Sequence, residues 1–361
     1  MGSRLNNITV MVTAAGAPGA PGIIKSLRIN GERDIKLIGT DMNKDAVGFF
    51  MVDKHYVAPP GDSPDFIKSI LNICNKEQVD VVLPLSTNEL MSFSRNVDKF
   101  KKEGIRVAVS RSEALEIANN KARLYEHLNN NGILVPKTIN VNTVKEFESA
   151  IYKLGYPENP VCFKPQFSKG SRGFRIINEN IDKLDLLMKY KPDSTITTLE
   201  ETIKILSDAK KFPELIVMEY LPGREYSVDT LVRNGNAIIT IPRYREVIKQ
   251  GISFIGVVEK NTEVIDISNK SVKSIGLDYN IGIQIKYSAD NEPSVLEINP
   301  RVQGTIVLCT AAGVNMPYFG VKLALGEEIP KCEPKWGLKM IRYWEEVYVL
   351  PSGEQFRLIP K

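Results

Sequence analysis

Histidine is the scarcest of the chemically versatile residues in this chain. His55 and His127 are the only two among 361 residues. Catalysis by a pair of histidines, or a metal site built from several, is therefore disfavoured, and each histidine reads as a surface or structural residue.

Cysteine is nearly as rare, and its four copies stand far apart, without a CxxC pair or a compact disulfide framework. This spacing favours reduced thiols, as in proteins of the cytoplasm. The cysteines are Cys74, Cys162, Cys309 and Cys332.

Long apolar runs and a strong excess of one charge are also missing. No run reaches the ~18 apolar residues typical of a membrane span, and the first residues do not resemble a signal peptide. The 47 basic and 43 acidic residues leave a net charge of +4, which is small for a protein that binds nucleic acid through a basic face. We therefore expect a cytoplasmic protein with no membrane partner and no nucleic acid partner.

What the chain does contain is a regular alternation of apolar strands and helices in its first third. This alternation predicts an α/β domain with a Rossmann-like parallel sheet over residues 1–112. The expected strands are 7–16, 35–41, 79–86 and 105–110, and the expected helices are 22–31, 63–78, a helix from 88, and 112–132.

From Pro160 onward the pattern changes to strands joined by short turns, which predicts an α+β unit with antiparallel sheets. "RNGN" at 233–236 is a type I′ hairpin signal, and "SADNEP" at 288–293 predicts another tight turn. We expect a second domain at 113–330, with a lid subdomain at about 135–221. The extension at 331–361 carries no motif that indicates a function.

The loop "TAAGAPGAPG" follows the first strand, and Asp41 ends the second. A dinucleotide fingerprint is G-x-G-x-x-G, whereas the glycines here are spaced G-x-x-G-x-x-G, and two prolines remove amides that could bind phosphate. Three interpretations stay open: a tight strand-to-helix turn with Pro21 starting the helix, the wall of a pocket for another substrate, or an NAD(P) site.

A phosphate-binding pattern follows Lys164, which ends an apolar strand in "PVCFKPQFSKGSRGFRII". Glycines in the following turn would let backbone amides approach phosphate oxygens. Further along, Glu219 and Glu225 flank Pro222-Gly223, where the backbone could contact a purine and an acid could accept ribose hydroxyls. An ordinary hairpin and two solvated carboxylates are the alternatives.

The strand "SVLEINPR" carries Glu297 and Asn299 two residues apart, hence on one face. If the preceding turn centres on Asp290-Asn291, Gln284 lies opposite Glu297. Three oxygen-bearing side chains would then converge, which suits Mg²⁺ completed by phosphate and water oxygens.

Taken together, these motifs resemble the ATP-grasp superfamily, most closely a synthetase module of the carbamoyl phosphate synthetase large subunit, over residues 8 to 326. The resemblance implies a pre-ATP-grasp domain followed by an ATP-grasp fold, with ATP and Mg²⁺ as cofactors and Mn²⁺ as an alternative ion. Asn120 stands where the family often has Asp before its Lys.

The resemblance also implies roles for individual residues. Arg301 would stabilise the transferred phosphoryl group, and the metal ligands would be Gln284, Glu297 and Asn299. The nucleotide-binding residues would be Lys121, Lys164, Ser168, Lys169, Gly170, Ser171, Gly173, Glu219, Tyr220, Leu221 and Glu225.

The expected activity is a carboxylate–amine or carboxylate–thiol ligase that acts through an acyl phosphate and releases ADP and phosphate. Arg243 and Arg245, on a strand leading to a glycine-hinged loop, would clamp the acid, with surface cations as the alternative. The expected partners are a small carboxylate and an amine, and a second copy of the chain in a homodimer. The rival hypotheses are a non-catalytic nucleotide-binding or regulatory protein and a nicotinamide-dependent oxidoreductase.

Overall fold

The computed structural model describes residues 5–166, 173–179, 182, 184, 188, 195–249 and 251–358. Contacts divide the chain into two compact units. Unit 1 comprises residues 1–119, 225–285 and 297–361, and unit 2 comprises residues 120–224 and 286–296. The units interleave along the chain, whereas the division expected from the sequence is linear. Each is described by itself.

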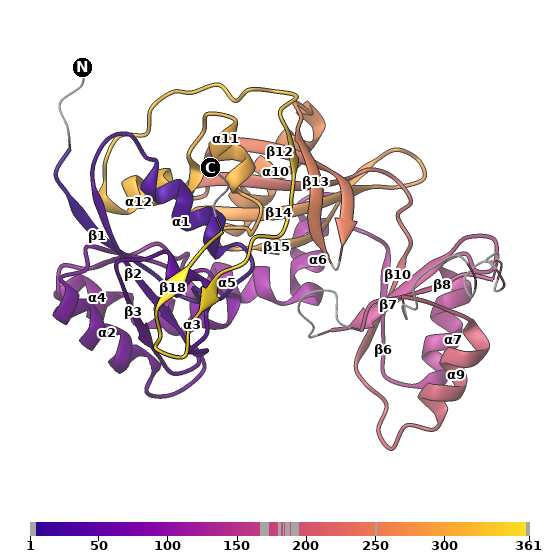
Figure 1. Ribbon diagram of the computed structural model, residues 1–361. Coiled ribbons are helices and arrows are strands. Elements are labelled where there is room, and N and C mark those ends of the chain that lie inside the picture. The colour runs from indigo at the N-terminus through magenta and orange to yellow at the C-terminus, as the bar shows by residue number, and fades with distance from the viewer. Residues whose placement is uncertain are drawn as a thin grey trace. The chain divides into compact units, whose positions relative to one another are not determined.

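Unit 1 begins with a five-stranded parallel sheet in the order β3-β2-β1-β4-β5 (Figure 1). The buried side chains of its strands are apolar apart from Thr40, as expected for a parallel sheet covered by helices. The strands are β1 Ile8–Val12, β2 Ile35–Asp41, β3 Lys54–Val57, β4 Val81–Leu83 and β5 Arg106–Val107. The helices are α1 Ala20–Arg28, the 3-10 turn η1 Val47–Phe50, α2 Phe66–Glu77, α3 Thr87–Arg95, α4 Val97–Lys102 and α5 Ser112–Asn119.

A second, six-stranded sheet has the order β15-β14-β11-β12-β13-β16. Its strands are β11 Glu225–Arg233, β12 Asn236–Lys249, β13 Ile252–Val258, β14 Tyr279–Tyr287, β15 Pro293–Asn299 and β16 Lys339–Ile341. The β11–β12 turn has positive φ at Asn234 (50°) and Gly235 (78°), which confirms the predicted type I′ hairpin. The helices α10 Thr262–Ile275, α11 Val307–Ala311 and α12 Met316–Leu325 complete this part.

The two sheets of unit 1 share one apolar core. Val10 and Leu37 of the parallel sheet belong to the same buried cluster as Leu231 and Ile241 of the second sheet, with α1, α11 and α12 contributing to it. This shared core therefore holds the strands of the two sheets in fixed positions relative to one another.

Unit 2 contains a smaller sheet in the order β6-β10-β7-β8-β9, with α7 and α9 against it (Figure 1). Phe147, Val161 and Val217 are among the residues of its buried core. The strands are β6 Thr138–Val141, β7 Val161–Pro165, β8 Arg175–Ile177, β9 Ile196–Thr197 and β10 Leu215–Glu219, and the helices are α6 Lys121–Asn130, α7 Val144–Lys153 and α9 Leu199–Ser207.

The N-terminal glycine loop forms the tight strand-to-helix turn that was one of the three interpretations. Gly19 precedes α1, and Pro21 lies in the first turn of that helix. A Cβ on Gly19 would lie 2.2 Å from the Cα of Gly304, so glycine is required by close backbone packing. The loop therefore borders the segment that follows β15.

The C-terminal segment, in which the sequence shows no functional motif, adds a strand to the second sheet. β16 pairs antiparallel with β13, with Ile255 opposite Ile341. Beyond it, β17 Tyr348–Val349 and β18 Gln355–Phe356 form a small hairpin. Along the stretches that the structure describes, no helix is long and apolar enough to cross a lipid bilayer.

Candidate active site

Polar side chains gather at the end of β15 in unit 1. The Asn299 amide donates from Nδ2 to Glu297 Oε1 at 3.0 Å, so the two side chains lie side by side on one face of the strand. Both are only partly buried. Within the described residues, no group of three or more His, Cys, Asp or Glu side chains is placed to hold a metal ion. A hard cation here would therefore need amide oxygens and non-protein oxygens beside Glu297, a donor set that suits Mg²⁺.

Gln284, the third expected ligand, lies in β14 and is partly buried. In the turn that leads to β15, Ser288 N–H donates to the Glu292 carbonyl at 2.9 Å, and Asn291 has φ 60°. The turn is thus centred on Asp290, half a residue from the expected centre. The pairing of Gln284 with Glu297 stays a prediction.

Arg301 lies two residues after the end of β15 and is oriented by three acceptors. Its Nε donates to Thr87 Oγ1 (3.2 Å), its Nη1 to the Val302 carbonyl (2.9 Å) and its Nη2 to Asn299 Oδ1 (3.4 Å). Burial lowers the pKa of the guanidinium, and the charge of Glu297 opposes this effect. Because Thr87 opens α3, Arg301 is held at the carboxyl edge of the parallel sheet, where open α/β sheets bind ligands.

Arg243 is buried rather than presented to solvent. Its Nε donates to Asp229 Oδ2 at 2.6 Å and its Nη2 to Gln303 Oε1 at 2.8 Å, and its Nη1 bonds Thr305. The residue is 1% exposed. Its guanidinium therefore fixes the segment that follows Arg301.

Arg245, the other member of the expected clamp, is also committed within the fold. Its guanidinium bonds Glu225, Ser253 Oγ (3.0 Å) and the Gly251 carbonyl (2.6 Å). Glu225, the expected ribose contact, is thus held in place by an ion pair with Arg245.

In unit 2, Lys164 points toward Tyr125. Its Nζ donates to the Tyr125 hydroxyl at 3.3 Å and lies 5.7 Å from the ring centroid. The same hydroxyl donates to the Leu296 carbonyl at 2.7 Å. The aromatic ring therefore positions the Lys164 ammonium group.

Lys121 is the first residue of α6, and its helix is capped by Asn120. The Asn120 side chain accepts from the Arg123 N–H at 3.1 Å. Asn caps a helix as well as Asp does, so Asn120 can take the place of the Asp that often precedes the family's Lys.

Glu219 is the last residue of β10, and Tyr220 and Leu221 follow it. The Glu219 carboxylate accepts from the Lys137 N–H at 2.8 Å, Lys286 lies over the Tyr220 ring at 5.1 Å, and Leu221 is buried. The segment is therefore ordered by contacts with side chains and backbone of the same unit.

The glycine-rich turn is described only at its last residue. Gly173 has φ 76°, and a Cβ there would lie 2.7 Å from Pro165 Cδ, so only glycine fits. The other expected phosphate-binding residues of this turn lie outside the described residues: Ser168, Lys169, Gly170 and Ser171.

Glu89 was missed by sequence reasoning. Its carboxylate accepts from Thr13 Oγ1 at 2.5 Å and from the Ser86 backbone, and burial raises its pKa to about 7, with the Asp41 charge adding to the shift. The signal was present in "STNE" at 86–89, a capping box in which Ser86 also accepts from the Asn88 N–H. The pattern predicts the cap but not its burial.

Two family models match this chain. Residues 211–346 match "ATP-grasp in the biosynthetic pathway with Ter operon", and residues 20–108 match "PylC-like, N-terminal domain". Together they cover the parallel sheet except β1, and the segment of β15 and after it that carries Glu297, Asn299 and Arg301.

Among curated proteins, the chain is similar to the carbamoyl phosphate synthase large chain of Clostridium acetobutylicum. The two are 25% identical over 276 residues, which is 73% of this chain and 24% of the relative. The chain spans about a quarter of the length of the large chains it matches.

Solved structures share the fold. The biotin carboxylase domain dimer of Hydrogenobacter thermophilus 2-oxoglutarate carboxylase, in complex with MgADP, ADP and bicarbonate, has a TM-score of 0.67 and 16% identity over 91% of this chain and 72% of its own. The N5-carboxyaminoimidazole synthetase of Staphylococcus aureus, complexed with ADP, has a TM-score of 0.66 and 18% identity over 92% and 82%. The expected fold class is confirmed: a parallel α/β domain followed by antiparallel sheets.

Proposed function

We propose that this chain is an ATP-grasp protein resembling a synthetase module of carbamoyl phosphate synthase. On that premise, it is an ATP- and Mg²⁺-dependent ligase that joins a carboxylate to an amine or a thiol. The observation that carries the proposal is the cluster at the end of β15. There Glu297 and Asn299 supply oxygens and Arg301 supplies a fixed positive charge, side by side.

The proposed reaction has two steps. A carboxylate oxygen of the acid attacks the γ-phosphorus of ATP, the bond to the β-phosphate oxygen breaks, and ADP leaves. The amine nitrogen or thiolate sulfur then attacks the acyl carbon, the carbon–oxygen bond to phosphate breaks, and phosphate leaves, while an attacking amine loses a proton. Positioning and neutralisation of charge carry such a transfer, which fits a chain with two histidines.

The side chains divide into two roles in this proposal. Arg301 neutralises charge on the transferred phosphoryl group, and a bound Mg²⁺ would neutralise the phosphate oxygens next to Gln284, Glu297 and Asn299. Arg243 and Arg245 act as positioning residues, since Arg243 holds Gln303 and Arg245 holds Glu225. The proposed nucleotide contacts are Lys121, Lys164, Gly173, Glu219, Tyr220, Leu221 and Glu225, with the glycine-rich turn before Gly173.

The test is a panel of amino acids and small acids offered with ATP, Mg²⁺ and amines, in which ADP and phosphate are both measured. The proposal expects one ADP and one phosphate per condensed product. AMP with pyrophosphate would overturn it, as would carbamoyl phosphate formed from bicarbonate and ammonia with two ADP. ATP binding without any substrate-stimulated ADP release would favour the non-catalytic nucleotide-binding alternative.

The assignment of Lys164 can be tested separately by titration calorimetry with ATP. Lys164→Ala should weaken ATP binding about tenfold or more, the scale of a lost charge-assisted contact. Lys153→Ala, an exposed lysine of α7 in the same unit, is the matched control. Equal affinities in Lys164→Ala and the parent would reduce this segment to an ordinary hairpin.

A further inference from the structure

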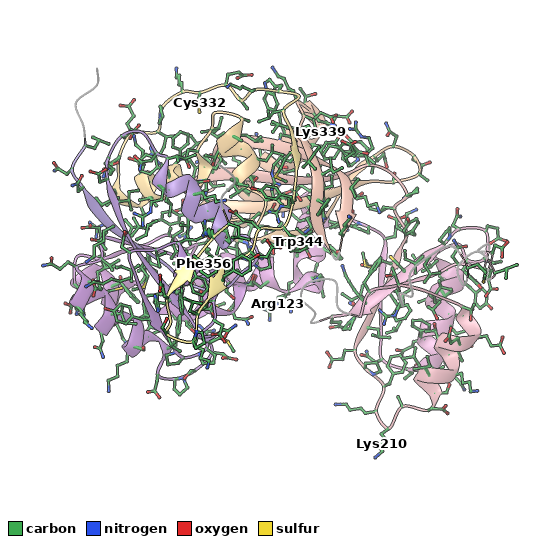
Figure 2. The ribbon with its side chains drawn as sticks, in the orientation of Figure 1. Arg123, Lys210, Cys332, Lys339, Trp344 and Phe356 are labelled. Atoms are coloured by element: carbon green, nitrogen blue, oxygen red, sulfur yellow. The ribbon has the colours of Figure 1, made fainter. Side chains whose placement is uncertain are left out.

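Tyr125 of unit 2 joins the two elements that carry the proposed phosphate-binding lysines. It stands four residues after Lys121 in α6, so both side chains leave the same face of that helix. Figure 2 labels Arg123, which lies between them in α6. Lys164 reaches the same tyrosine from β7, with its Nζ 3.3 Å from the hydroxyl oxygen and 5.7 Å from the ring centroid. One aromatic side chain thus links the helix of Lys121 to the strand of Lys164.

The hydrogen bonds of the Tyr125 hydroxyl have a definite direction. Its single proton is donated to the Leu296 carbonyl at 2.7 Å, so its oxygen accepts from the Lys164 ammonium, which has only donors. Leu296 belongs to β15, which is also tied to the loop after α6, because the Val295 N–H donates to the Leu134 carbonyl at 2.9 Å. The oxygen that meets Lys164 is therefore held against the backbone of a strand.

Burial differs between the two partners. Tyr125 is 4% exposed, and Leu124 and Leu128 of the same helix are fully buried, so the ring cannot shift without opening the packing of α6. Lys164 is only partly buried, and its ammonium stands on a flexible four-carbon stem. The tyrosine is thus the fixed member of the pair, and the lysine is the member whose position depends on it.

The stability of the fold does not by itself account for the contact with Lys164. A buried tyrosine hydroxyl needs a hydrogen-bond partner, and the Leu296 carbonyl already provides one. The bond from Lys164 is therefore additional to what burial of the hydroxyl requires. Its effect falls on the lysine, whose ammonium receives a fixed position.

We infer that Tyr125 is a positioning residue, whose hydroxyl and ring hold the Lys164 ammonium in place for a nucleotide phosphate. The inference rests on the proposed function, which assigns Lys164 to ATP. A lysine that is not held loses rotamer freedom when it binds an anion, and this loss reduces the affinity. A lysine held by Tyr125 has lost that freedom before the nucleotide binds. Tyr125 therefore raises the affinity for the phosphates by acting through Lys164.

The experiment is a double-mutant cycle on the full chain, measured by titration calorimetry with MgATP. Tyr125→Phe keeps the ring and removes only the hydroxyl, and it should weaken MgATP binding about threefold to tenfold, the scale of one net hydrogen bond. Lys164→Met keeps most of the stem and removes the ammonium. In the Lys164→Met background, adding Tyr125→Phe should change the affinity less than about twofold, because the hydroxyl then has no lysine to hold.

A second ligand and a second tyrosine provide the controls. Adenosine has no phosphates, so Tyr125→Phe should leave its affinity within about twofold, whereas general damage to the nucleotide site would weaken adenosine and MgATP alike. Tyr152→Phe makes the same change at a 52% exposed tyrosine of α7 in the same unit. It should leave both affinities within about twofold, since surface substitutions away from a site have small effects.

Four results would overturn the inference: parent-like MgATP affinity in Tyr125→Phe, an equal loss in the Lys164→Met background, an equal loss for adenosine, or a Tyr125→Phe variant that does not fold. If the cycle gives the expected result but no acid stimulates ADP release, the proposed ligase function fails and the role of Tyr125 stands. A parent chain that binds no MgATP would overturn both.

Discussion

Two regions of unit 1 hold charge in different ways: the surroundings of Glu77 and the segment from Glu297 to Thr305. Glu77 accepts hydrogen bonds from Lys36 (2.8 Å), Tyr56 (2.6 Å) and Lys54 (3.0 Å). These donors, Lys36 first, lower the pKa of the Glu77 carboxyl to about 2. Each charged group in this cluster has an oppositely charged partner within the fold, with Lys36 and Lys54 sharing the one carboxylate of Glu77.

The segment after β15 is matched only in part. Arg243 has Asp229, whereas Arg301 and Arg342 have carbonyl, hydroxyl and amide oxygens, and Gln303 Nε2 has no partner among the described residues. The Glu77 cluster shows that this fold can give a buried carboxylate oppositely charged partners where no ligand is involved. Where charge is left unmatched at a sheet's carboxyl edge, a ligand is the expected partner.

The largest effect should follow from Glu297→Ala. The substitution removes the one carboxylate from the unmatched segment, so ATP-dependent product formation should fall at least about 10²-fold, the scale of a lost transition-state electrostatic contact. The melting temperature should stay near that of the parent, because Glu297 is only partly buried and its bonded neighbour Asn299 is also partly exposed. A coupled assay of phosphate release measures the loss of product formation, and thermal melting measures the stability. Near-normal turnover in Glu297→Ala would contradict the proposal that the segment after β15 binds a ligand and the Glu77 cluster does not.

Asp229→Asn tests the matched part of the same neighbourhood. It leaves the guanidinium of Arg243 without its carboxylate in a fully buried site, which should destabilise the protein by roughly 3–5 kcal/mol. Urea unfolding measures this loss. Asp266→Asn, which breaks the exposed pair of Asp266 with Lys270 on α10, is the control and should cost less than about 1 kcal/mol. Similar losses in both variants would contradict the assignment of Arg243 to the core.

Local patterns predicted much of this arrangement and long-range pairing accounts for the rest. Period-2 alternation was enough to place Glu297 beside Asn299, and "RNGN" was enough for the β11–β12 turn. The hydrogen bond from Arg342 to the Gly304 carbonyl could not be predicted, because it depends on the pairing of Ile255 with Ile341, far apart in sequence. No short motif marks such an edge strand.

The ion pair of Arg243 with Asp229 could not be predicted, for the same reason. Asp229 lies diagonally across the β11–β12 pair from Arg243, and Thr305 comes from a segment beyond β15. Two arginines spaced two residues apart on a strand share a face, but the spacing does not show whether that face lies toward solvent or toward the core. Burial is a property of the packed sheet, not of the local pattern.

Glu89→Gln sharpens the comparison through pH. Burial raises the pKa of Glu89 from 4.5 to about 7, so the native state holds a proton that the unfolded state releases, and the parent loses stability as pH rises across that window. At about 1.4 kcal/mol per pKa unit, the loss is roughly 3 kcal/mol. Glu89→Gln lacks this slope and should gain stability relative to the parent between acidic and neutral pH. Urea unfolding at several pH values measures it, with the exposed Glu103→Gln as control. Parallel slopes in parent and Glu89→Gln would contradict the burial argument.

The smallest effect is expected from Glu77→Gln, with the opposite sign in pH. Because the folded pKa of Glu77 is lowered to about 2, its contribution is present above the unfolded value of 4.5 and is lost as pH falls toward 2. Glu77→Gln should therefore be less stable than the parent at neutral pH, and the difference should vanish in acid. The difference should be modest, because the side chains of Lys36 and Lys54 are 41% and 53% exposed and water screens their charges. ATP-dependent turnover should be unchanged, since each partner of Glu77 belongs to the fold. A variant that kept its stability but lost turnover would show that matched charge can also serve catalysis, and the contrast between the two regions would fall.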